Sequence, residues 1–539
     1  MTEAALFLFI ILPWLSPFTL GPTASVAPLL VSWACATALS LTRAPIQDAT
    51  AILKRFGAVA LLFLGAALWQ TGIPPGAETL ALGMSLLAIL ACAIRFSGSG
   101  RADARLVARA WLLAGLASAL MGWLQYTGMG SSLAPWVSHA NFGEAFGNLR
   151  QRNLYASLTS IALCALLWLA RNDAWFHRPL RVILPAALLA AGNALSHSRT
   201  GLFELLLILG LAGIWALHRE RAARWALAPV VPAYLIAAVG LPMLFTAGTH
   251  PGIFTRLSEG APTCSSRMTL WSNVLELIGQ KPWFGWGWGR LDYAHYMHLY
   301  EGVRFCDILD NAHNLPLHLA VELGAPMALI LCGAALWATW RSRPWRESDP
   351  LRQLAWTVLA VLALHSLLEY PLWYGPFQMA LGICLGLLWP ARRANAGRPF
   401  VGVALAAPLM AGVALGALDY HRALQIYLAP DERAAAYRDH TLEKVRAVWI
   451  FRDQVRFAEL TTTPLERGNA KWTHAMATSL LTFSPEPRVI EKAIESAVML
   501  GRDDEALQQL VHFRAAFPKD HAEWAAPLHG QPSRSEPEN

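Results

Sequence analysis

Long apolar runs recur along the first 420 positions of the chain, and they constrain its fold more than any other feature. A run of about 20 apolar residues is long enough for an α-helix to cross the hydrocarbon core of a bilayer. In that core a helix satisfies its own backbone hydrogen bonds. The chain is 55% hydrophobic and only 15% charged, whereas soluble proteins carry about 25% charged residues. We therefore expect an all-α, polytopic integral membrane protein.

The apolar runs predict about 13 transmembrane helices. The predicted spans lie near 4–20, 25–42, 54–70, 78–95, 106–128, 153–170, 180–197, 201–217, 225–246, 315–340, 352–370, 372–390 and 400–418. The first run has no basic segment ahead of it and no small-residue cleavage site. It is therefore interpreted as a span and not as a cleavable signal peptide.

Arginine and lysine residues gather in alternate loops, and this distribution predicts the orientation. Cytoplasmic loops carry an excess of these residues, so the net charge of +7 is interpreted as topology and not as nucleic-acid binding. The cation-rich loops contain Arg43, Lys54, Arg55, Arg95, Arg101, Arg105, Arg109, Arg171, Arg178, Arg181, Arg219, Arg221, Arg224, Arg341, Arg343, Arg346, Arg352, Arg392, Arg393 and Arg398. With a cytoplasmic N-terminus, the long loop 247–312 and the C-terminal segment then face the outside.

The segment after position 418 is charged and rich in Ala, Leu, Glu and Arg, with helical periodicity. Prolines interrupt it at Pro430, Pro464, Pro485 and Pro518. We expect about four or five amphipathic helices in a repeat-like stack whose period is irregular. The predicted domains are a transmembrane domain at 1–418, a periplasmic α-helical domain at 419–528 and a disordered tail at 529–539.

Two cysteines, Cys264 and Cys306, lie in the long loop, whereas the other cysteines lie inside predicted spans. Two cysteines in one loop of an oxidising compartment can form a disulfide. The alternative is a pair of free thiols.

A polar cluster, Asp310, Asn311, His313 and Asn314, directly precedes the apolar run that begins near 315. Backbone N–H groups at a helix start attract anions, and Pro316 is compatible with a first helical turn. Histidine changes charge near neutral pH, which makes His313 a candidate general base. The alternative is a hydrogen-bonded interface residue.

Other polar residues are predicted at the same membrane face. Arg152, Arg199 and Arg267 supply always-charged forks that suit a diphosphate, although a single outer Arg is more often solvated. The neighbouring polar residues are Gln151, Asn153, His365, Glu369 and Tyr370. His365 and Glu369 are spaced to satisfy each other on one helix face. Trp286 and Trp288, between glycines, predict a platform for sugar rings or a membrane anchor.

Metal and nucleotide chemistry has little support in the sequence. His365 and Glu369 lack a third ligand at a fixed spacing, and the outer side has no paired D-x-D acids. A Gly-rich phosphate loop of the ATPase type is also missing. We expect no metal and no cofactor.

Several motifs between 147 and 376 resemble those of the bacterial O-oligosaccharyltransferases, the protein glycosylation ligases that modify pilins and other exported proteins. This family lies in a superfamily with the O-antigen ligases and polymerases. The matching motifs are RQRNLYASL, SRTG, SSRMTLW, FGWGWG, DNAHNLPLHLAVELG and HSLLEYPLWYGPF. The EYPLWY and RQRN segments are most similar to the protein-glycosylating branch. The C-terminal segment shows no matching motif.

The resemblance implies a GT-C-like, metal-independent glycosyltransferase of the bacterial inner membrane. Its donor would be a glycan on undecaprenyl diphosphate at the periplasmic face, and its acceptor a Ser or Thr hydroxyl of an exported protein. His313 and Tyr370 match positions important for activity, and Arg199 and Arg267 match arginines thought to hold the diphosphate. Asp310 or Asn311 would hold the ring of His313.

Two other readings of the sequence remain open. One keeps the chemistry and changes the acceptor, as in an O-antigen ligase that uses lipid A-core or in a glycan polymerase; the EYPLWY segment argues against it. The other is a flippase or transporter for the lipid-linked glycan. A transporter needs polar residues across the bilayer midplane, whereas here the polar groups concentrate at one face.

Overall fold

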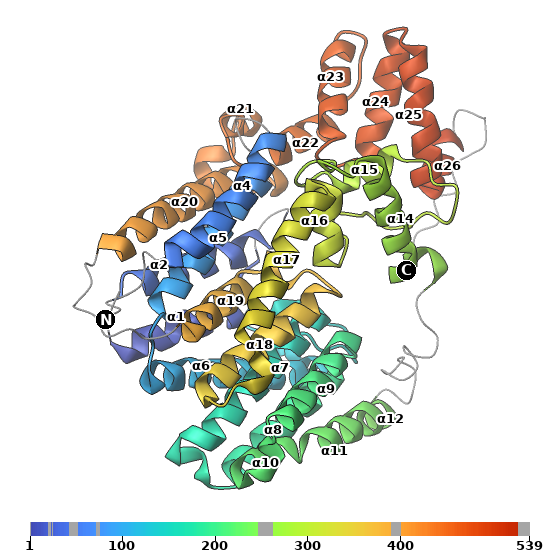
Figure 1. Ribbon diagram of the computed structural model, residues 1–539. Helices are drawn as coiled ribbons and strands as arrows, with labels where there is room; N and C mark the ends of the chain where they lie inside the picture. The colour runs from blue at the N-terminus through green and yellow to red at the C-terminus, as the bar shows by residue number, and fades with distance from the viewer. Residues whose placement is uncertain are drawn as a thin grey trace. The chain divides into compact units, whose positions relative to one another are not determined.

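The computed structural model describes residues 2–19, 23, 25–42, 52–71, 76–245, 262–389 and 400–526. In these residues the regular structure is entirely helical (Figure 1). The predicted all-α class is therefore confirmed for this part of the chain. The predicted disordered tail, 529–539, lies outside it.

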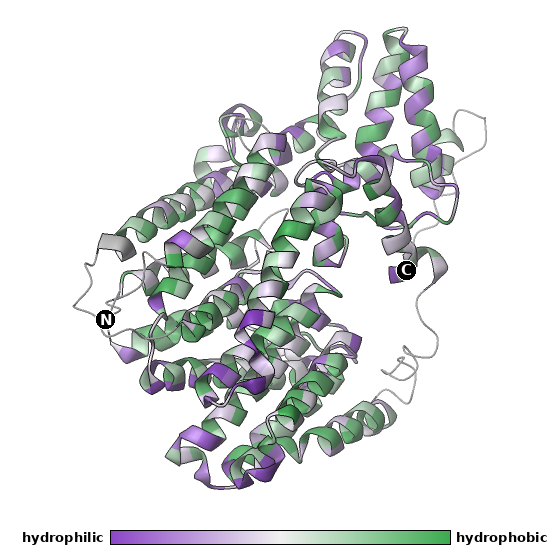
Figure 2. Ribbon diagram, in the orientation of Figure 1, coloured by the Kyte–Doolittle hydropathy of each residue, from purple (hydrophilic) through white to green (hydrophobic). Residues whose placement is uncertain are grey.

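Within the described residues, each predicted span overlaps a helix or a run of helices. These are α1 (Glu3–Leu15), α2 (Val26–Ser40), α4 (Ala58–Thr71), α5 (Ala77–Arg95), α6 (Arg101–Tyr126), α7 (Arg152–Asn172), α8 (Leu180–Leu195), α9 (Arg199–Ile214), α10 (Arg221–Leu227), α11 (Val230–Leu235), α12 (Leu241–Phe245), α16 (Leu315–Leu323), α17 (Ala325–Ser342), α18 (Pro350–Ser366), α19 (Gly375–Leu388) and α20 (Phe400–Leu424). Figure 2 shows hydrophobic residues dominating many of them.

Five helical segments in the described part are long and apolar enough to cross a membrane, judged by length and composition. They are Ala77–Arg95, Arg101–Tyr126, Arg152–Asn172, Arg221–Phe245 and Gly402–Tyr427. The chain is thus a multi-pass membrane protein, and the full number of about 13 spans stays a prediction.

The chain divides into two compact units. The first comprises 1–63, 81–260 and 333–415, and the second comprises 64–80, 261–332 and 416–539. The second unit groups most of the long loop with the C-terminal segment. This division follows contacts between residues, whereas the predicted domain boundary at 418 follows hydropathy. That boundary stays a prediction of where the transmembrane domain ends.

Helix α7 forms the centre of the first unit. It packs against α6, α8, α9, α10 and α18, and 94% of its most apolar stretch is buried. Small residues allow the close packing: a Cβ on Gly115 would lie 2.2 Å from Ala162, and one on Gly201 would lie 2.5 Å from Ala156. Gln151 caps α7, since its side chain accepts from Leu154 N at 2.6 Å. The first turn of α7 is therefore firmly placed.

In the second unit the C-terminal helices form a stack. They are α21 (Thr441–Val445), α22 (Arg452–Thr462), α23 (Ala470–Leu480), α24 (Pro487–Met499), α25 (Asp503–Ala516) and α26 (Pro518–Ala525). Successive helices from α22 to α26 pack on one another, and α24 and α25 lie side by side in Figure 1. Four or five helices were predicted here without bounds; α22–α26 agree with that number, and α21 is a further short helix.

The long loop packs on this stack through α15 (Leu291–Met297). Tyr296 is buried among the apolar side chains of the stack, and its hydroxyl donates to Gln509 Oε1 at 2.8 Å. Arg290 Nη1 donates to Thr482 O at 3.1 Å. The loop and the C-terminal helices therefore share one core.

The predicted continuous helix over 315–340 is interrupted at Gly324, between α16 and α17. Gly324 has φ +89°, and a Cβ there would lie 2.2 Å from Trp283 O. Trp286 N donates to Val321 O at 2.8 Å and Ala325 N to Pro282 O at 2.8 Å. The helix breaks at Gly324 because backbone groups on both sides of it form hydrogen bonds with the segment around Trp283 instead of continuing the helical pattern.

Candidate active site

In the first unit Asn153 joins three of the motifs singled out in the sequence. Its Nδ2 donates to Glu369 Oε1 at 3.1 Å, and its Oδ1 accepts from Ser198 Oγ at 2.6 Å. Ser198 also caps α9, accepting from Gly201 N at 2.9 Å. The RQRN segment, the SRTG segment and the residues after α18 therefore meet at one polar cluster, Asn153, Ser198 and Glu369. We call it the outer polar cluster after the membrane face predicted for these residues.

The other candidates of this unit flank the outer polar cluster in sequence. Arg199 is the first residue of α9 and is exposed. Tyr370 is half-buried and stacks on Tyr374, with ring centroids 5.9 Å apart. Arg152 lies 3.5 Å from Glu144 Oε1. Because Arg152 has a carboxylate partner, it is a weaker candidate for holding an anion than Arg199.

Below the outer polar cluster lies a buried network of Ser157, Glu204 and His365, all with no exposed surface. Ser157 Oγ donates to Glu204 Oε1 and lies 2.6 Å from His365 Nδ1. A hydroxyl has one proton to donate, so a Ser157 that donates to Glu204 accepts from His365. That arrangement requires the His365 tautomer with its proton on Nδ1.

The network gives His365 and Glu369 hydrogen-bond partners beyond each other, and their mutual pairing stays a prediction. Helix α18 ends at Ser366, but Glu369 N still donates to His365 O at 2.8 Å. The His365 ring lies against Ser157, and the Glu369 carboxylate accepts from Asn153. Glu204 was not among the residues singled out from the sequence. The signal was present, because an acidic residue inside a predicted span is costly and usually functional.

In the second unit His313 is half-buried and has φ +48°. Asn311 Oδ1 accepts from His313 N at 2.9 Å, and Asn314 Oδ1 caps α16 by accepting from Leu317 N at 3.1 Å. Both asparagines therefore fix the backbone on either side of the histidine, and Pro316 occupies the first turn of α16. Asp310 is exposed.

Arg267 is the first residue of α14 (Arg267–Gln280), and Ser266 caps that helix by accepting from Thr269 N at 3.2 Å. Close by in sequence, Cys264 is bonded to Cys306, with Cα atoms 5.3 Å apart. Cys306 N also donates to Cys264 O at 3.2 Å. The start of α14 is therefore tied to the segment that leads to His313.

The two tryptophans proposed as a glycan platform have partners inside the second unit. Trp286 Nε1 donates to Leu277 O at 3.0 Å, and the ammonium of Lys281 lies 3.9 Å from the ring centroid of Trp286. Trp288 is buried and packs edge-on against His318. Trp288 thus offers little surface to a ligand. His318 itself lies 3.3 Å from the buried Glu322, a pair that sequence reasoning missed.

The environment of α15 shifts two titratable groups. Burial, together with the nearby Glu322 and Asp310, raises the pKa of the Asp292 carboxyl to about 8. Burial lowers the pKa of His295 to about 3, an effect strengthened by Arg304. Asp292 and His295 are therefore both held in their neutral forms at pH 7.

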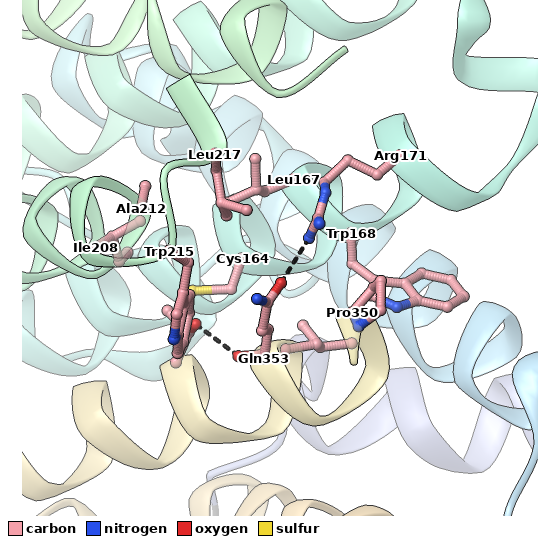
Figure 3. Close-up of a pocket in the computed structure, with 12 residues that line it drawn as sticks. Cys164, Leu167, Trp168, Arg171, Ile208, Ala212, Trp215, Leu217, Pro350 and Gln353 are labelled. Atoms are coloured by element: carbon pink, nitrogen blue, oxygen red, sulfur yellow. Dashed lines mark hydrogen bonds between the residues drawn. The ribbon is translucent and has the colours of Figure 1, made fainter. Parts of the chain in front are cut away.

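A small cavity of about 10 Å³ lies between α7, α9 and α18 (Figure 3). Arg171 Nη1 donates to Gln353 Oε1 at 2.9 Å in its wall. This volume suits about one water molecule. It is too small for a lipid-linked glycan, and it lies toward the other end of α7 from Asn153.

Comparison with known proteins adds independent evidence. A family model described as "Protein glycosylation ligase" matches residues 145–170, one described as "O-Antigen ligase" matches 184–332, and one described as "Virulence factor membrane-bound polymerase, C-terminal" matches 353–529. The resemblance to the O-oligosaccharyltransferases is confirmed.

Two curated relatives bear O-oligosaccharyltransferase names. One is the "General O-oligosaccharyltransferase" of Acinetobacter baylyi (strain ATCC 33305 / BD413 / ADP1), 26% identical over 291 residues, covering 51% of this chain and 48% of the relative. The other is the "ComP-specific O-oligosaccharyltransferase" of the same strain, 25% identical over 248 residues, covering 46% and 44%. The chain thus spans about half the length of these O-oligosaccharyltransferases.

The three family models divide the candidate residues between them. The glycosylation-ligase model covers Asn153, the O-antigen ligase model covers Arg199, Arg267 and His313, and the polymerase model covers Tyr370. The last model also extends over α22–α26, where no motif had been recognised from the sequence.

Proposed function

We propose that the chain is an O-oligosaccharyltransferase that moves a glycan en bloc from undecaprenyl diphosphate to Ser or Thr of exported proteins such as pilins. The reaction would take place at the periplasmic face of the bacterial inner membrane. The observation that carries the proposal is the outer polar cluster, because Asn153 brings the RQRN, SRTG and EYP segments together. The names of the curated relatives support the same reaction.

Arg199 is the group proposed to hold the donor's diphosphate in the first unit. Its side chain is exposed at the start of α9, where the helix N-terminus also favours negative charge. As the glycosyl bond breaks, negative charge grows on the diphosphate, and a preorganised guanidinium stabilises it. Arg267, at the start of α14, is proposed for the same task, and Tyr370 for binding the glycan or the diphosphate.

His313 is proposed as the group that receives the acceptor's proton. The hydroxyl oxygen attacks the anomeric carbon, the bond from that carbon to the diphosphate oxygen breaks, and the electron pair leaves with the diphosphate. The hydroxyl proton moves to His313. In-line attack inverts the anomeric centre. The step needs no metal or cofactor, because the donor already carries its leaving group.

The decisive experiment is reconstitution with lipid-linked oligosaccharide and a pilin-like acceptor, read out by acceptor mass. His313→Asn is the sharpest variant, because asparagine tolerates the left-handed backbone of φ +48° better than alanine does. His440→Asn is the matched control, since His440 has φ +51° in the C-terminal segment. We expect transfer to fall about 10²–10⁴-fold in His313→Asn only. Full activity of that variant would remove His313 from the mechanism.

A second candidate function is O-antigen ligation or glycan polymerisation, because one family model is described as an O-antigen ligase and another as a virulence factor membrane-bound polymerase. The same reconstitution distinguishes them when lipid A-core and a second lipid-linked glycan are offered beside the pilin. Modified lipid A-core would assign a ligase, and a lengthened lipid-linked glycan would assign a polymerase. Movement of the donor across the bilayer without any modified acceptor would assign a flippase.

A further inference from the structure

The first unit contains an open pocket of about 400 Å³ beside α8 and α10, and none of its lining residues is among those proposed for glycan transfer. Its lining residues are Ile183, Arg221, Arg224, Trp225, Ala228 and Pro229. The two arginines are exposed, and the other four residues are apolar or aromatic. The pocket therefore joins positive charge to an apolar wall.

The positive charge of the pocket is not neutralised by the surrounding protein. Within the part of the chain that the structure describes, no carboxylate forms an ion pair with Arg221 or Arg224. The neighbouring Glu220 pairs with Arg171 instead, at 2.7 Å. The guanidinium of Arg221 lies 5.3 Å from the ring centroid of Trp225, which orients it without removing its charge. Two uncompensated guanidinium groups favour an anion, and phosphate suits their geometry.

Exposed apolar residues follow the pocket-lining segment in sequence. Val231 and Leu235 are four residues apart in α11, which places them on one face of that helix. Val231 and Leu235 are 48% and 46% exposed. A soluble phosphate gains nothing from such residues, whereas the acyl chain of a lipid does.

We propose that this pocket binds the headgroup of an anionic phospholipid. Arg221 and Arg224 contact the phosphate, Trp225 lies at the level of the glycerol backbone, and an acyl chain runs over Val231 and Leu235. Tryptophan favours this interfacial depth. The predicted topology places the pocket at the cytoplasmic leaflet, where basic pockets between membrane helices bind anionic headgroups. The site is independent of the proposed glycan transfer.

The test uses the purified full-length chain in detergent, with lipid binding measured by native mass spectrometry. Phosphatidylglycerol, phosphatidylcholine and inorganic phosphate are the probes. Arg221→Gln/Arg224→Gln removes the site, and Arg341→Gln/Arg346→Gln removes the same charge from another predicted cytoplasmic loop. We expect phosphatidylglycerol to bind about 30-fold more weakly to the Arg221→Gln/Arg224→Gln variant than to the wild type. Its binding to the Arg341→Gln/Arg346→Gln variant should be unchanged.

Three results would overturn the proposal. Equal binding of phosphatidylcholine and phosphatidylglycerol would exclude recognition of the anionic headgroup. Displacement of the lipid by an equimolar amount of inorganic phosphate would point to a soluble anion as the ligand. Unchanged binding in the double variant would exclude the two arginines. If the double variant fails to fold, the single variants serve instead, each with an expected weakening of about fivefold.

Discussion

Arg199 combines an exposed guanidinium with a firmly held backbone, because Ser198 behind it caps α9 and bonds to Asn153. We expect Arg199→Gln to weaken binding of undecaprenyl diphosphate about 10–100-fold, since a charge-assisted hydrogen bond is lost. Arg101 provides the control, because it is also an exposed first residue of a helix, α6. Arg101→Gln should leave affinity unchanged. Equal affinity of both variants for a fluorescent donor analogue would exclude the proposed role of Arg199.

His365 Nδ1 lies 3.6 Å from Glu204 Oε1, and both side chains are fully buried. We expect a double-mutant cycle with Glu204→Gln and His365→Ala, followed by melting in detergent, to show coupling of about 0.6–1.7 kcal/mol. The control pair, Glu204→Gln and Arg446→Gln, joins residues of different compact units and should be additive. Additivity of the buried pair as well would show that the network contributes nothing as a unit.

Residue types and their order predicted part of this arrangement. Asn153 and Glu369 were singled out as supporting groups, and both are found in the outer polar cluster. Their mutual hydrogen bond, however, joins residues far apart in sequence, and only the packing of α7, α9 and α18 brings them together. The roles of the candidate residues stay predictions, because hydrogen bonds place side chains without showing what they bind.

At the scale of elements, helices were predictable where hydrophobicity persists, and their interruptions were not. The apolar run over 315–340 indicates one helix, yet the chain breaks at Gly324. The reason lies in Trp283, whose carbonyl leaves no room for a Cβ on Gly324. The hydrophobicity of residues 315–340 contains no information about a steric constraint that a segment elsewhere in the sequence imposes.

The element α15 predicts a measurable pH dependence. Burial raises the pKa of Asp292 to about 8, from an ordinary value of 3.8. Between these values the folded chain keeps a proton that the unfolded chain has released. The stability contributed by this group is therefore complete below about pH 4 and is lost as the pH rises through 8.

We expect Asp292→Asn to abolish this decline, because asparagine stays neutral at every pH. Melting temperatures in detergent at pH 5, 6.5 and 8 should show the variant gaining on the wild type as the pH rises. His295, whose pKa is lowered, gives the opposite slope in both proteins and cancels in the difference. Asp307→Asn, at an exposed position, serves as the control. Parallel curves for wild type and Asp292→Asn would contradict the prediction.

For the whole molecule, the charge distribution predicts that the C-terminal helices lie outside the cytoplasm. Alkaline phosphatase fused after Trp524 should be active and green fluorescent protein fused there should be dark. The reverse is expected for fusions after Arg343, in a predicted cytoplasmic loop. A fluorescent C-terminal fusion would show that the number of spans is even. A third fusion site, after Tyr300, would then test the proposed orientation of the loop that carries His313.

The second unit is assembled from stretches that are far apart in the chain, and this has a consequence for biosynthesis. Tyr296 is covered by α23–α25, which leave the ribosome long after α15 does. Until then the apolar surface around Tyr296 stays open to water and to other proteins. A chain that stops before α23 would therefore expose the apolar surface of its loop, and chaperones and proteases on that side of the membrane would be the first to encounter it.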